Sequence, residues 1–343
     1  MIIVNIFLIH HRSPHHAENS GYGRLIDFIE AKVVYGRTKF PFRIAKIIAG
    51  LYRKDKGNYN VGSVLKTVEL YRLLQKTKNE KNVVHFLNGE RDIRHLGFLK
   101  KKFPNTKFCA TFHKPPEILK ETISNPVALQ QLDAAIAVGD NQVDFLKEWL
   151  QLENVTYIPH GVDTQFFVPN TTKKKGTKLL FVGQHLRDFE ILNTTVPLLA
   201  EKIKNLQVQV VVHPAYTSKV KPHMCLTIWT NVNDVQLRKL YQEATVLYLP
   251  LLNSTACNSI LEAMACGLPI ITNNVGGNVA YLKNTSNILI DSGNSKRFLN
   301  ETIAVLKNQT CLTKMGELSR KQSLELNWEN IGVSINELYK SLA

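Results

Sequence analysis

Short apolar runs rich in β-branched residues alternate with helical patterns along the whole chain, and this alternation restricts the fold more than any other feature. In the first half the predicted strands are 2–9, 33–35, 83–87, 108–112, 134–138 and 156–158, and the clearest predicted helices are 23–31, 61–76 and 141–150. Strands that alternate with helices form parallel sheets. The sequence therefore predicts an α/β fold of the Rossmann type.

The second half repeats this architecture after a polar stretch, Pro169–Thr177, that carries three consecutive lysines. Its predicted strands are 179–182, 208–212, 226–229, 246–250, 270–272 and 288–290, and its clearest helices are 235–244 and 259–265. A chain of 343 residues also exceeds what one hydrophobic core usually supports. We predict two domains, 1–169 and 170–343, that face each other across a cleft, and leave open whether the last helix crosses back to the first.

The basic residues are concentrated in the first predicted domain. Residues 32–107 hold 19 lysines and arginines against 5 acidic residues, which accounts for +14 of the total charge of +15. Such asymmetry indicates an anionic partner: a membrane surface, a nucleic acid or a phosphorylated acceptor. Nucleic acid is the weakest of the three, because no recognition motif accompanies the charge.

Part of this basic region has the pattern of an interfacial helix. Within Phe42–Lys54, the residues Ile44, Ile47, Ile48 and Leu51 share one helical face, and cations occupy the rest. Such a helix would dock the first domain on an anionic membrane. The alternative is a helix that packs its apolar face on the core and exposes a solvated basic face.

Nothing in the sequence indicates secretion. The first apolar run, Met1–Ile9, is too short to span a bilayer and lacks a basic flank or a cleavage site. The five cysteines are scattered and include no CxxC pair. We expect a cytoplasmic protein, with peripheral binding to the inner face of the membrane as an open possibility.

The strongest chemical signal is the segment Asn253–Gly277, in which a small polar loop runs into a helix that ends at Gly267. Backbone N–H groups and the dipole at a helix N-terminus favour an anion such as a nucleotide diphosphate. Glu262, expected on the first helical turn, has a carboxylate able to accept hydrogen bonds from the two ribose hydroxyls. A Ser-x-x-Glu match in isolation is more often a helix cap.

The neighbouring residues favour the binding interpretation. The run Leu261–Pro269, followed by Val275-Gly276-Gly277, resembles retaining glycosyltransferases of family 4 (group 1 type), which have the GT-B fold. Four further segments agree in order: Ile158–Asp163, Leu180–Gly183, Leu240–Ala244 and Trp328 near the end. The resemblance implies transfer of a hexose-like sugar from a UDP- or GDP-sugar to a glycan or lipid-linked acceptor.

We expect the following donor-binding residues, of which Arg187 is proposed as a substitute for missing family cations and the others follow from the resemblance: Gly183, Gln184, Arg187, Asn253, Ser254, Ala256, Cys257, Asn258, Ser259 and Glu262. Two positions depart from the family. Ser254 replaces the first acid of the Glu-x7-Glu motif, so its task passes to the hydroxyl, or to Asn253 or Asn258. Gln184 replaces an arginine, and the usual lysine is missing, so we expect Arg187 to clamp the diphosphate, the alternative being a surface pair with Asp188.

Two segments of the first domain complete the predicted site. Gly21, Tyr22 and Gly23 follow the first strand, where backbone amides are able to approach the donor phosphates. His113 ends a strand at the carboxyl edge of the sheet and is similar to the family's sugar-binding histidine, so we assign it with Glu262 to the catalytic centre. The alternative is a loop histidine packed on Pro115 and Pro116.

No Asp-x-Asp sequence that would hold a divalent cation is present, and there is no strong pair of catalytic carboxylates. We therefore expect a metal-independent glycosyltransferase without a cofactor. The resemblance to retaining enzymes implies that the leaving diphosphate takes the acceptor proton, which requires no pair of catalytic carboxylates. Two alternatives stay open: a GT-B sugar-nucleotide epimerase, and a basic membrane-binding protein whose donor site has decayed.

Overall fold

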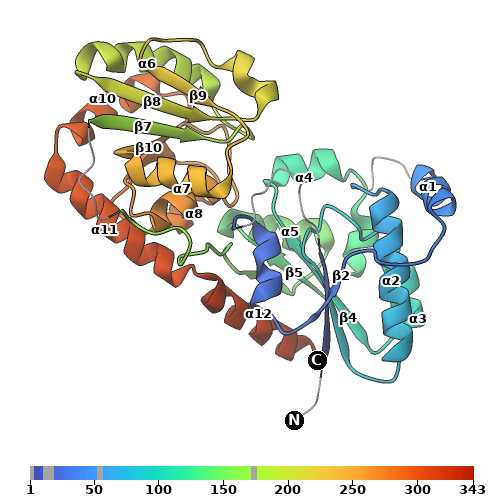
Figure 1. The fold of residues 1–343 in the computed structure, drawn as a ribbon. Helices are drawn as coiled ribbons and strands as arrows, with labels where there is room; N and C mark the ends of the chain where they lie inside the picture. The colour runs from blue at the N-terminus through green and yellow to red at the C-terminus, as the bar shows by residue number, and fades with distance from the viewer. Residues whose placement is uncertain (1–3, 11–18, 52–56, 171–175) are drawn as a thin grey trace. The chain divides into compact units, whose positions relative to one another are not determined.

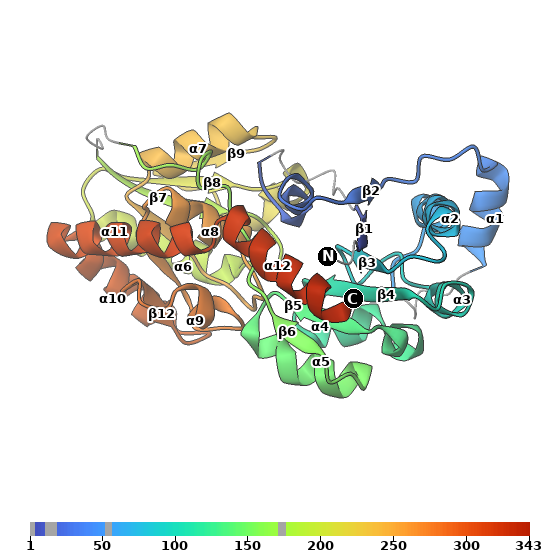
Figure 2. The ribbon, with the colours of Figure 1, turned by 90° about the horizontal axis from the view of Figure 1, so that it is seen from below.

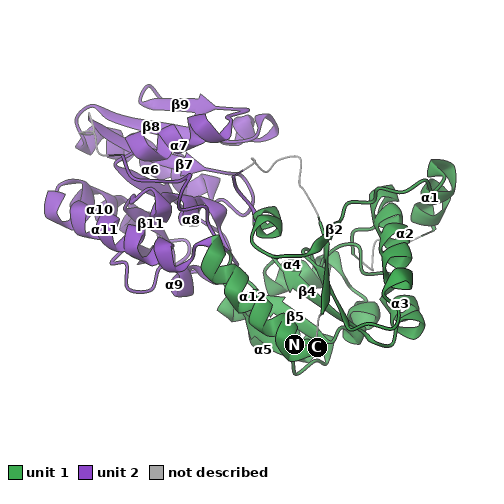
Figure 3. Ribbon diagram, turned by 60° about the horizontal axis from the view of Figure 1, so that its bottom comes forward, with its two compact units in different colours: residues 1–16, 22–160, 328–343 green, residues 17–21, 161–327 purple. Residues whose placement is uncertain are grey.

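The computed structural model describes residues 4–10, 19–51, 57–170 and 176–343. The chain divides into two compact units, which Figure 3 shows in different colours. Unit 1 contains residues 1–16, 22–160 and 328–343, and unit 2 contains 17–21 and 161–327. Each unit therefore includes one short segment from a distant part of the chain.

Unit 1 is built on a six-stranded sheet, and every neighbouring pair in it is parallel. Its strands, in the spatial order β2-β1-β3-β4-β5-β6, are Lys32–Val34, Asn5–Ile9, Asn82–Phe86, Thr106–Phe112, Ala134–Ala137 and Val155–Tyr157. The central strand β3 is buried along its whole length, as expected for a parallel sheet covered on both faces. All six predicted strands are present.

The helices of unit 1 are α1 (Phe42–Gly50), α2 (Val61–Lys76), α3 (Leu96–Lys102), α4 (Pro116–Thr122), α5 (Val143–Leu150) and α12 (Trp328–Leu342), with 3-10 turns η1 (Tyr22–Asp27), η3 (Pro126–Gln131) and η4 (Asp140–Gln142). The α-helix expected over 23–31 is wrong, because the chain forms η1 instead. Tyr22 and Leu25 are both buried, and their spacing of three residues matches one 3-10 turn.

Unit 2 repeats the design with a second six-stranded parallel sheet (Figure 1). In the spatial order β12-β11-β10-β7-β8-β9, its strands are Ile288–Ile290, Ile270–Asn273, Val246–Leu249, Thr177–Val182, Leu206–Val211 and Leu226–Trp229. Its helices are α6 (Phe189–Lys202), α7 (Asp234–Glu243), α8 (Asn258–Ala265), α9 (Asn278–Tyr281), α10 (Ser295–Leu306) and α11 (Gln309–Glu325), with the 3-10 turn η5 (Pro214–Lys219). α6 packs with α10, and α8 packs with α7 and α11.

Each sheet has a point where the strand order reverses, and doubly wound folds bind ligands beyond the carboxyl ends of the strands at such a point. In unit 1 the reversal lies between β1 and β3. In unit 2 it lies between β7 and β10. The loops that follow these four strands are therefore the first places to look for a site.

Each unit has its own hydrophobic core. The core of unit 1 includes Phe108 and Phe112, and that of unit 2 includes Phe181 and Tyr248, all almost fully buried. Trp328 begins α12 within unit 1, where its ring stacks on Phe28. In the described part of the chain, no helix is both long and apolar enough to cross a bilayer.

The short helix α1 packs against α2, as Figure 2 shows. Ala45 is fully buried, whereas Ile44, Ile47 and Leu51 are 47%, 64% and 77% exposed. The alternative in which this apolar face packs on the core is therefore wrong. Residues 52–54 of the predicted helix lie outside the described residues.

Candidate functional site

Helix α8 begins at the switch point of unit 2, after the loop that follows β10. Its N-cap is Cys257, whose side chain makes no capping hydrogen bond, so the capping interpretation of the Ser-x-x-Glu match is wrong. The helix begins at Asn258, so Glu262 lies on its second turn. The sequence-based expectation that Glu262 lies on the first turn is therefore wrong. The uncapped N-terminus is suited to an anion.

Arg187 connects the two loops of this switch point. Its Nε donates to Val182 O at the end of β7 (2.8 Å), and one terminal nitrogen donates to His185 O (2.9 Å). The other terminal nitrogen contacts Ser259 Oγ at 3.1 Å and Cys257 Sγ at 3.5 Å. The guanidinium therefore lies beside the N-terminus of α8.

Asp188, the expected partner in the alternative interpretation, has a different task. Its carboxylate accepts from Ile191 N at 3.0 Å and caps helix α6. Among the described residues no ion pair joins Arg187 to Asp188. The surface-pair alternative is therefore wrong.

Gly183 makes room for the guanidinium. Its φ is 93°, a left-handed conformation that favours glycine, and a Cβ there would lie 2.7 Å from the terminal nitrogen of Arg187. Gln184, next in the loop, is half-buried. A cation beside a helix N-terminus is electrostatically unfavourable unless an anion binds between them, and this arrangement selects for a negatively charged ligand.

Glu262 is buried, with 4% of its surface exposed, and both carboxylate oxygens accept hydrogen bonds. Oε2 accepts from the Tyr241 hydroxyl at 2.8 Å, and Oε1 accepts from the Ser20 hydroxyl. Burial raises the pKa of Glu262 to about 7, although the two hydrogen bonds oppose this shift. The carboxyl group is therefore poised to gain or lose a proton near neutral pH.

The contact with Ser20 was not predicted from the sequence. The segment 19–21 belongs to unit 2, and Asn19 donates from its backbone N (2.7 Å) and its Nδ2 (3.0 Å) to Asp234 Oδ2 at the start of α7. Asn19 and Ser20 thus fasten this segment beside Glu262. The only sequence signal was its proximity to Gly21, which has a φ of 86°.

The loop between β10 and α8 packs tightly on the glycines that follow β11. Asn253 Oδ1 accepts from Ser254 N at 2.7 Å, and Gly277 N donates to Ser254 O at 3.3 Å. Gly276 has a φ of 51°, and a Cβ there would lie 1.7 Å from Ser254 O. Ser254 is buried, whereas Asn253, Ala256 and Asn258 are half-buried.

In unit 1, His113 follows β4 and is held by the loop after β3. Its Nε2 donates to Leu87 O at 2.8 Å, and its backbone N donates to Glu90 Oε1 at 2.8 Å. Its ring meets the Tyr22 ring edge-on, with centroids 4.7 Å apart. The ring is half-buried. These contacts fix the orientation of the imidazole and leave Nδ1 as the acceptor of the neutral ring.

Tyr22 is a core residue of unit 1. Its hydroxyl accepts from Thr111 Oγ1 at 3.1 Å, and Thr111 also contacts His85, which in turn contacts the hydroxyl of Tyr339 on α12. Burial, helped by the nearby His113, lowers the pKa of His85 to about 3 and keeps it neutral. The side chain of Tyr22 thus supports His113, and Gly23 lies within η1.

Within the described residues, no group of three or more His, Cys, Asp or Glu side chains is arranged to hold an ion.

Unit 2 contains the part of the chain that matches a known sequence family. Residues 176–308 match the sequence model of a family described as glycosyl transferases group 1. The matched residues make up most of unit 2. The match includes both loops of the unit 2 switch point, together with Arg187 and Glu262.

Curated proteins are similar to this chain at low identity. The D-inositol 3-phosphate glycosyltransferase of Corynebacterium urealyticum is 22% identical over 262 residues, which are 67% of this chain and 61% of the relative. That of Segniliparus rotundus is 23% identical over 240 residues, 62% of this chain and 53% of the relative. The matched part therefore spans less than two thirds of either relative.

Solved structures extend the similarity to nearly the whole chain. A glycosyltransferase from Rickettsia africae has a TM-score of 0.69 at 14% identity and covers 99% of this chain and 98% of its own. Anabaena HepE, in complex with UDP and glucose, has a TM-score of 0.69 at 13% identity, with coverage of 98% and 99%. The chain thus has the GT-B fold that the sequence predicted, with two Rossmann-like units.

Proposed function

We propose that this protein transfers a hexose-like sugar from a UDP- or GDP-sugar to a glycan or lipid-linked acceptor, with retention of the anomeric configuration. The observation that carries the proposal is the position of the Arg187 guanidinium at the uncapped N-terminus of α8, one helical turn before the buried carboxyl group of Glu262. An anion site beside a hydrogen-bond acceptor suits a nucleoside diphosphate.

The donor is held mainly by unit 2. The diphosphate binds between Arg187 and the first N–H groups of α8, where positive charge is already in place. The ribose hydroxyls donate to Glu262 and take the position that the Ser20 hydroxyl has in the free protein. Asn253 and Asn258, both half-buried in the same loop region, contact the sugar together with Ser254.

In the reaction, the bond between the anomeric carbon and the diphosphate oxygen breaks while the acceptor oxygen bonds to the same face of that carbon. The proton of the acceptor hydroxyl passes to the leaving diphosphate oxygen. His113 hydrogen-bonds the sugar and stabilises charge at the reacting centre. Arg187 and the α8 dipole neutralise the leaving group, so this proposal requires no metal ion, and activity in EDTA should equal activity without it.

Surface properties of unit 1 support peripheral binding at an anionic membrane, on the cytoplasmic side. The residues 32–51 include no acidic side chain, and their five cations, Lys32, Arg37, Lys39, Arg43 and Lys46, are all exposed. The exposed apolar side chains of α1 lie within the same stretch. This combination of apolar and basic side chains is typical of interfacial helices.

A thermal-shift screen against UDP, GDP and their common sugar conjugates tests the donor proposal. A ligand present at 100 times its Kd stabilises the folded protein by about 2.7 kcal/mol, which is readily measured. A shift with a nucleotide sugar, followed by transfer of the labelled sugar to a glycan or lipid-linked acceptor, supports the transferase.

The same experiment separates the alternatives. Conversion of the nucleotide sugar to its epimer without transfer would identify an epimerase. Absence of any shift would instead leave a membrane-binding protein with a decayed donor site.

A further inference from the structure

The switch point of unit 1 is formed by β1 and β3, and the loop after β3 carries a set of hydrogen-bond acceptors that the donor site does not use. This loop, residues 87–93, is fixed against β4. Gly89 N donates to Thr111 O at 2.6 Å, and a Cβ on Gly89 would lie 2.7 Å from the Phe112 ring. The loop is therefore a rigid part of the sheet edge where doubly wound folds bind ligands.

Glu90 is the most deeply placed of these acceptors, with only 2% of its surface exposed. Its Oε1 accepts from the backbone nitrogens of His113 (2.8 Å) and Lys114 (3.0 Å). Its Oε2 is buried, and no described residue donates a hydrogen bond to it. A buried carboxylate oxygen without a donor is unfavourable, so Oε2 is suited to a ligand that brings its own hydrogen-bond donor.

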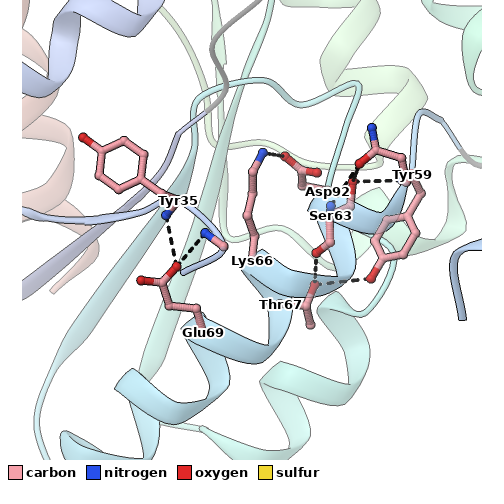
Figure 4. A network of polar contacts seen from close by, with 9 residues as sticks. Tyr35, Tyr59, Ser63, Lys66, Thr67, Glu69 and Asp92 are labelled. Carbon is pink, nitrogen blue, oxygen red and sulfur yellow. Dashed lines mark hydrogen bonds and ion pairs between the residues drawn. The ribbon is translucent and has the colours of Figure 1, made fainter. Parts of the chain in front are cut away.

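Two neighbouring residues repeat this pattern. Asp92, 7% exposed, pairs through Oδ2 with Lys66 Nζ at 2.8 Å, as Figure 4 shows, while its Oδ1 has no donor among the described residues. Asn88 Oδ1 is also buried without a donor in the described structure. Asp92 has a φ of 65°, a strained conformation that the loop maintains. In the loop 87–93, every second residue from Asn88 to Asp92 thus has a buried side-chain oxygen that is able only to accept a hydrogen bond.

We propose that this loop binds the acceptor substrate, and that the bound part of the acceptor is a neutral polyol such as a sugar ring or inositol. Hydroxyl groups supply the donors that Glu90 Oε2, Asp92 Oδ1 and Asn88 Oδ1 require. The inference rests on the proposed function, in which unit 2 binds the nucleotide-sugar donor, and it adds that unit 1 binds the acceptor. His113, joined to Glu90 through its backbone N, lies next to the bound polyol.

The surrounding charges select a neutral polyol over other ligands. Phosphate oxygens are acceptors and would be repelled by the three acceptor oxygens. A hydroxyl group is able to donate to these oxygens and also to accept from Arg91 Nε, which is buried without a partner among the described residues. An ammonium group or metal ion would meet the positive charges of Lys66, Arg91 and Lys114, which lie in or next to the same contacts. Any phosphate or lipid on the acceptor therefore lies outside this loop.

Ligand-detected NMR on the full chain tests the proposal with myo-inositol and the methyl glycosides of glucose, mannose and galactose, each with and without UDP or GDP. The decisive variant is Glu90→Gln. Its amide oxygen still accepts from the two backbone nitrogens, but its amide nitrogen replaces a hydrogen-bond acceptor with a donor. We expect the Kd of at least one polyol to rise tenfold or more, with the fold intact by circular dichroism.

Glu69→Gln is the matched control, because Glu69 lies on α2, outside the loop 87–93, and one of its carboxylate oxygens is held by backbone nitrogens. Glu69 Oε2 accepts from the backbone nitrogens of Tyr35, Gly36 and Arg37 at 3.1, 2.6 and 2.8 Å. Figure 4 shows Glu69 beside Tyr35. Polyol binding should be unchanged in this variant.

Equal polyol binding by wild type and Glu90→Gln, or no binding by wild type, would overturn the proposal and leave ordered water as the partner of Glu90. Donor-sugar hydrolysis is measured separately. Its absence together with Glu90-dependent polyol binding would contradict the proposed function alone.

Discussion

The hydroxyl of Tyr241 on α7 donates a 2.8 Å hydrogen bond to Oε2 of Glu262 on α8. This contact fixes a buried carboxyl group that forms no ion pair with any described residue. Burial raises the pKa of Glu262 to about 7 and that of Tyr241 well above its usual range. Tyr241 therefore stays a hydrogen-bond donor at neutral pH, while Glu262 is present in both its protonated and its deprotonated form.

Nucleotide affinity should depend on pH through this group. Ribose hydroxyls donate to the carboxylate, so binding selects the deprotonated form and releases a proton. With a pKa of about 7, the deprotonated fraction rises roughly tenfold between pH 6 and pH 8, and the Kd for UDP or GDP should fall by about the same factor. Calorimetric titration across this range measures the change.

Glu262→Gln is the control for this prediction, because glutamine does not titrate and should bind nucleotide weakly without that pH dependence. The folded protein also holds the Glu262 proton more tightly than the unfolded chain, whose pKa is near 4.5. This group's contribution to stability is complete below about pH 4.5 and is lost as pH rises through 7, by about 3 kcal/mol. A wild-type Kd that does not change with pH would contradict the assignment.

Replacement of Arg187 by alanine should raise the donor KM at least tenfold. Charge-assisted hydrogen bonds typically contribute about 1.5–3 kcal/mol, which is a factor of roughly 10 to 150 in affinity. Initial rates at varied donor concentration, with the fold checked by circular dichroism, measure the change. Arg297→Ala removes the same charge from the surface of unit 2, where the side chain is 45% exposed, and should leave the KM unchanged.

Donor kinetics that are unaltered in Arg187→Ala would exclude Arg187 from the phosphate site. Arg187→Lys adds a further test, because lysine keeps the charge but lacks the planar fork that reaches the carbonyls of Val182 and His185. We expect it to recover only part of the lost affinity.

The strands and the two-unit design could be predicted because they depend on local pattern. β3 and β10 are buried along their whole length, and their apolar runs were visible in the sequence. The type of η1 could not be predicted, since a spacing of three between Tyr22 and Leu25 suits an α-helix as well as a 3-10 turn. Tertiary contacts decide between the two.

The site was predictable where a motif carried it and unpredictable where distant segments meet. Glu262 and Arg187 were named from the sequence, although which atoms Arg187 contacts depends on a turn that brings it over Gly183. The contact between Ser20 and Glu262 joins residues 242 positions apart and has no local signal. Glu90 was missed because a polar residue after a buried strand is usually an ordinary loop residue.

Gly276 should tolerate no side chain, because the donor loop packs directly on it. In Gly276→Ala the Cβ would lie 1.7 Å from Ser254 O, and alanine at a φ of 51° adds backbone strain. We expect a loss of about 3 kcal/mol or more in the free energy of unfolding, together with weaker nucleotide binding. Gly293→Ala is the matched control, since it has a φ of 74° but no atom within 4 Å of its Cβ, and should lose about 1 kcal/mol.

Exposed side chains of α1 should determine membrane binding. Burying Phe42, Ile47 and Leu51, which are 64%, 64% and 77% exposed, in a lipid interface removes their apolar surface from water. The nearby cations should each add about 1 kcal/mol when the lipid is anionic. In flotation, wild type should therefore rise with vesicles of phosphatidylcholine and phosphatidylglycerol and remain largely below with phosphatidylcholine alone.

Changing Phe42, Ile47 and Leu51 to serine should lower the bound fraction at least tenfold. Serine at Val127, Leu198 and Met224 is the control, because these side chains are 61%, 43% and 98% exposed and lie far from α1 in the sequence. If both triple variants lost binding equally, general surface hydrophobicity would explain it. If wild type floated equally with both lipid mixtures, the basic side chains would have no part in docking, because a surface that binds through charge must distinguish an anionic bilayer from a neutral one.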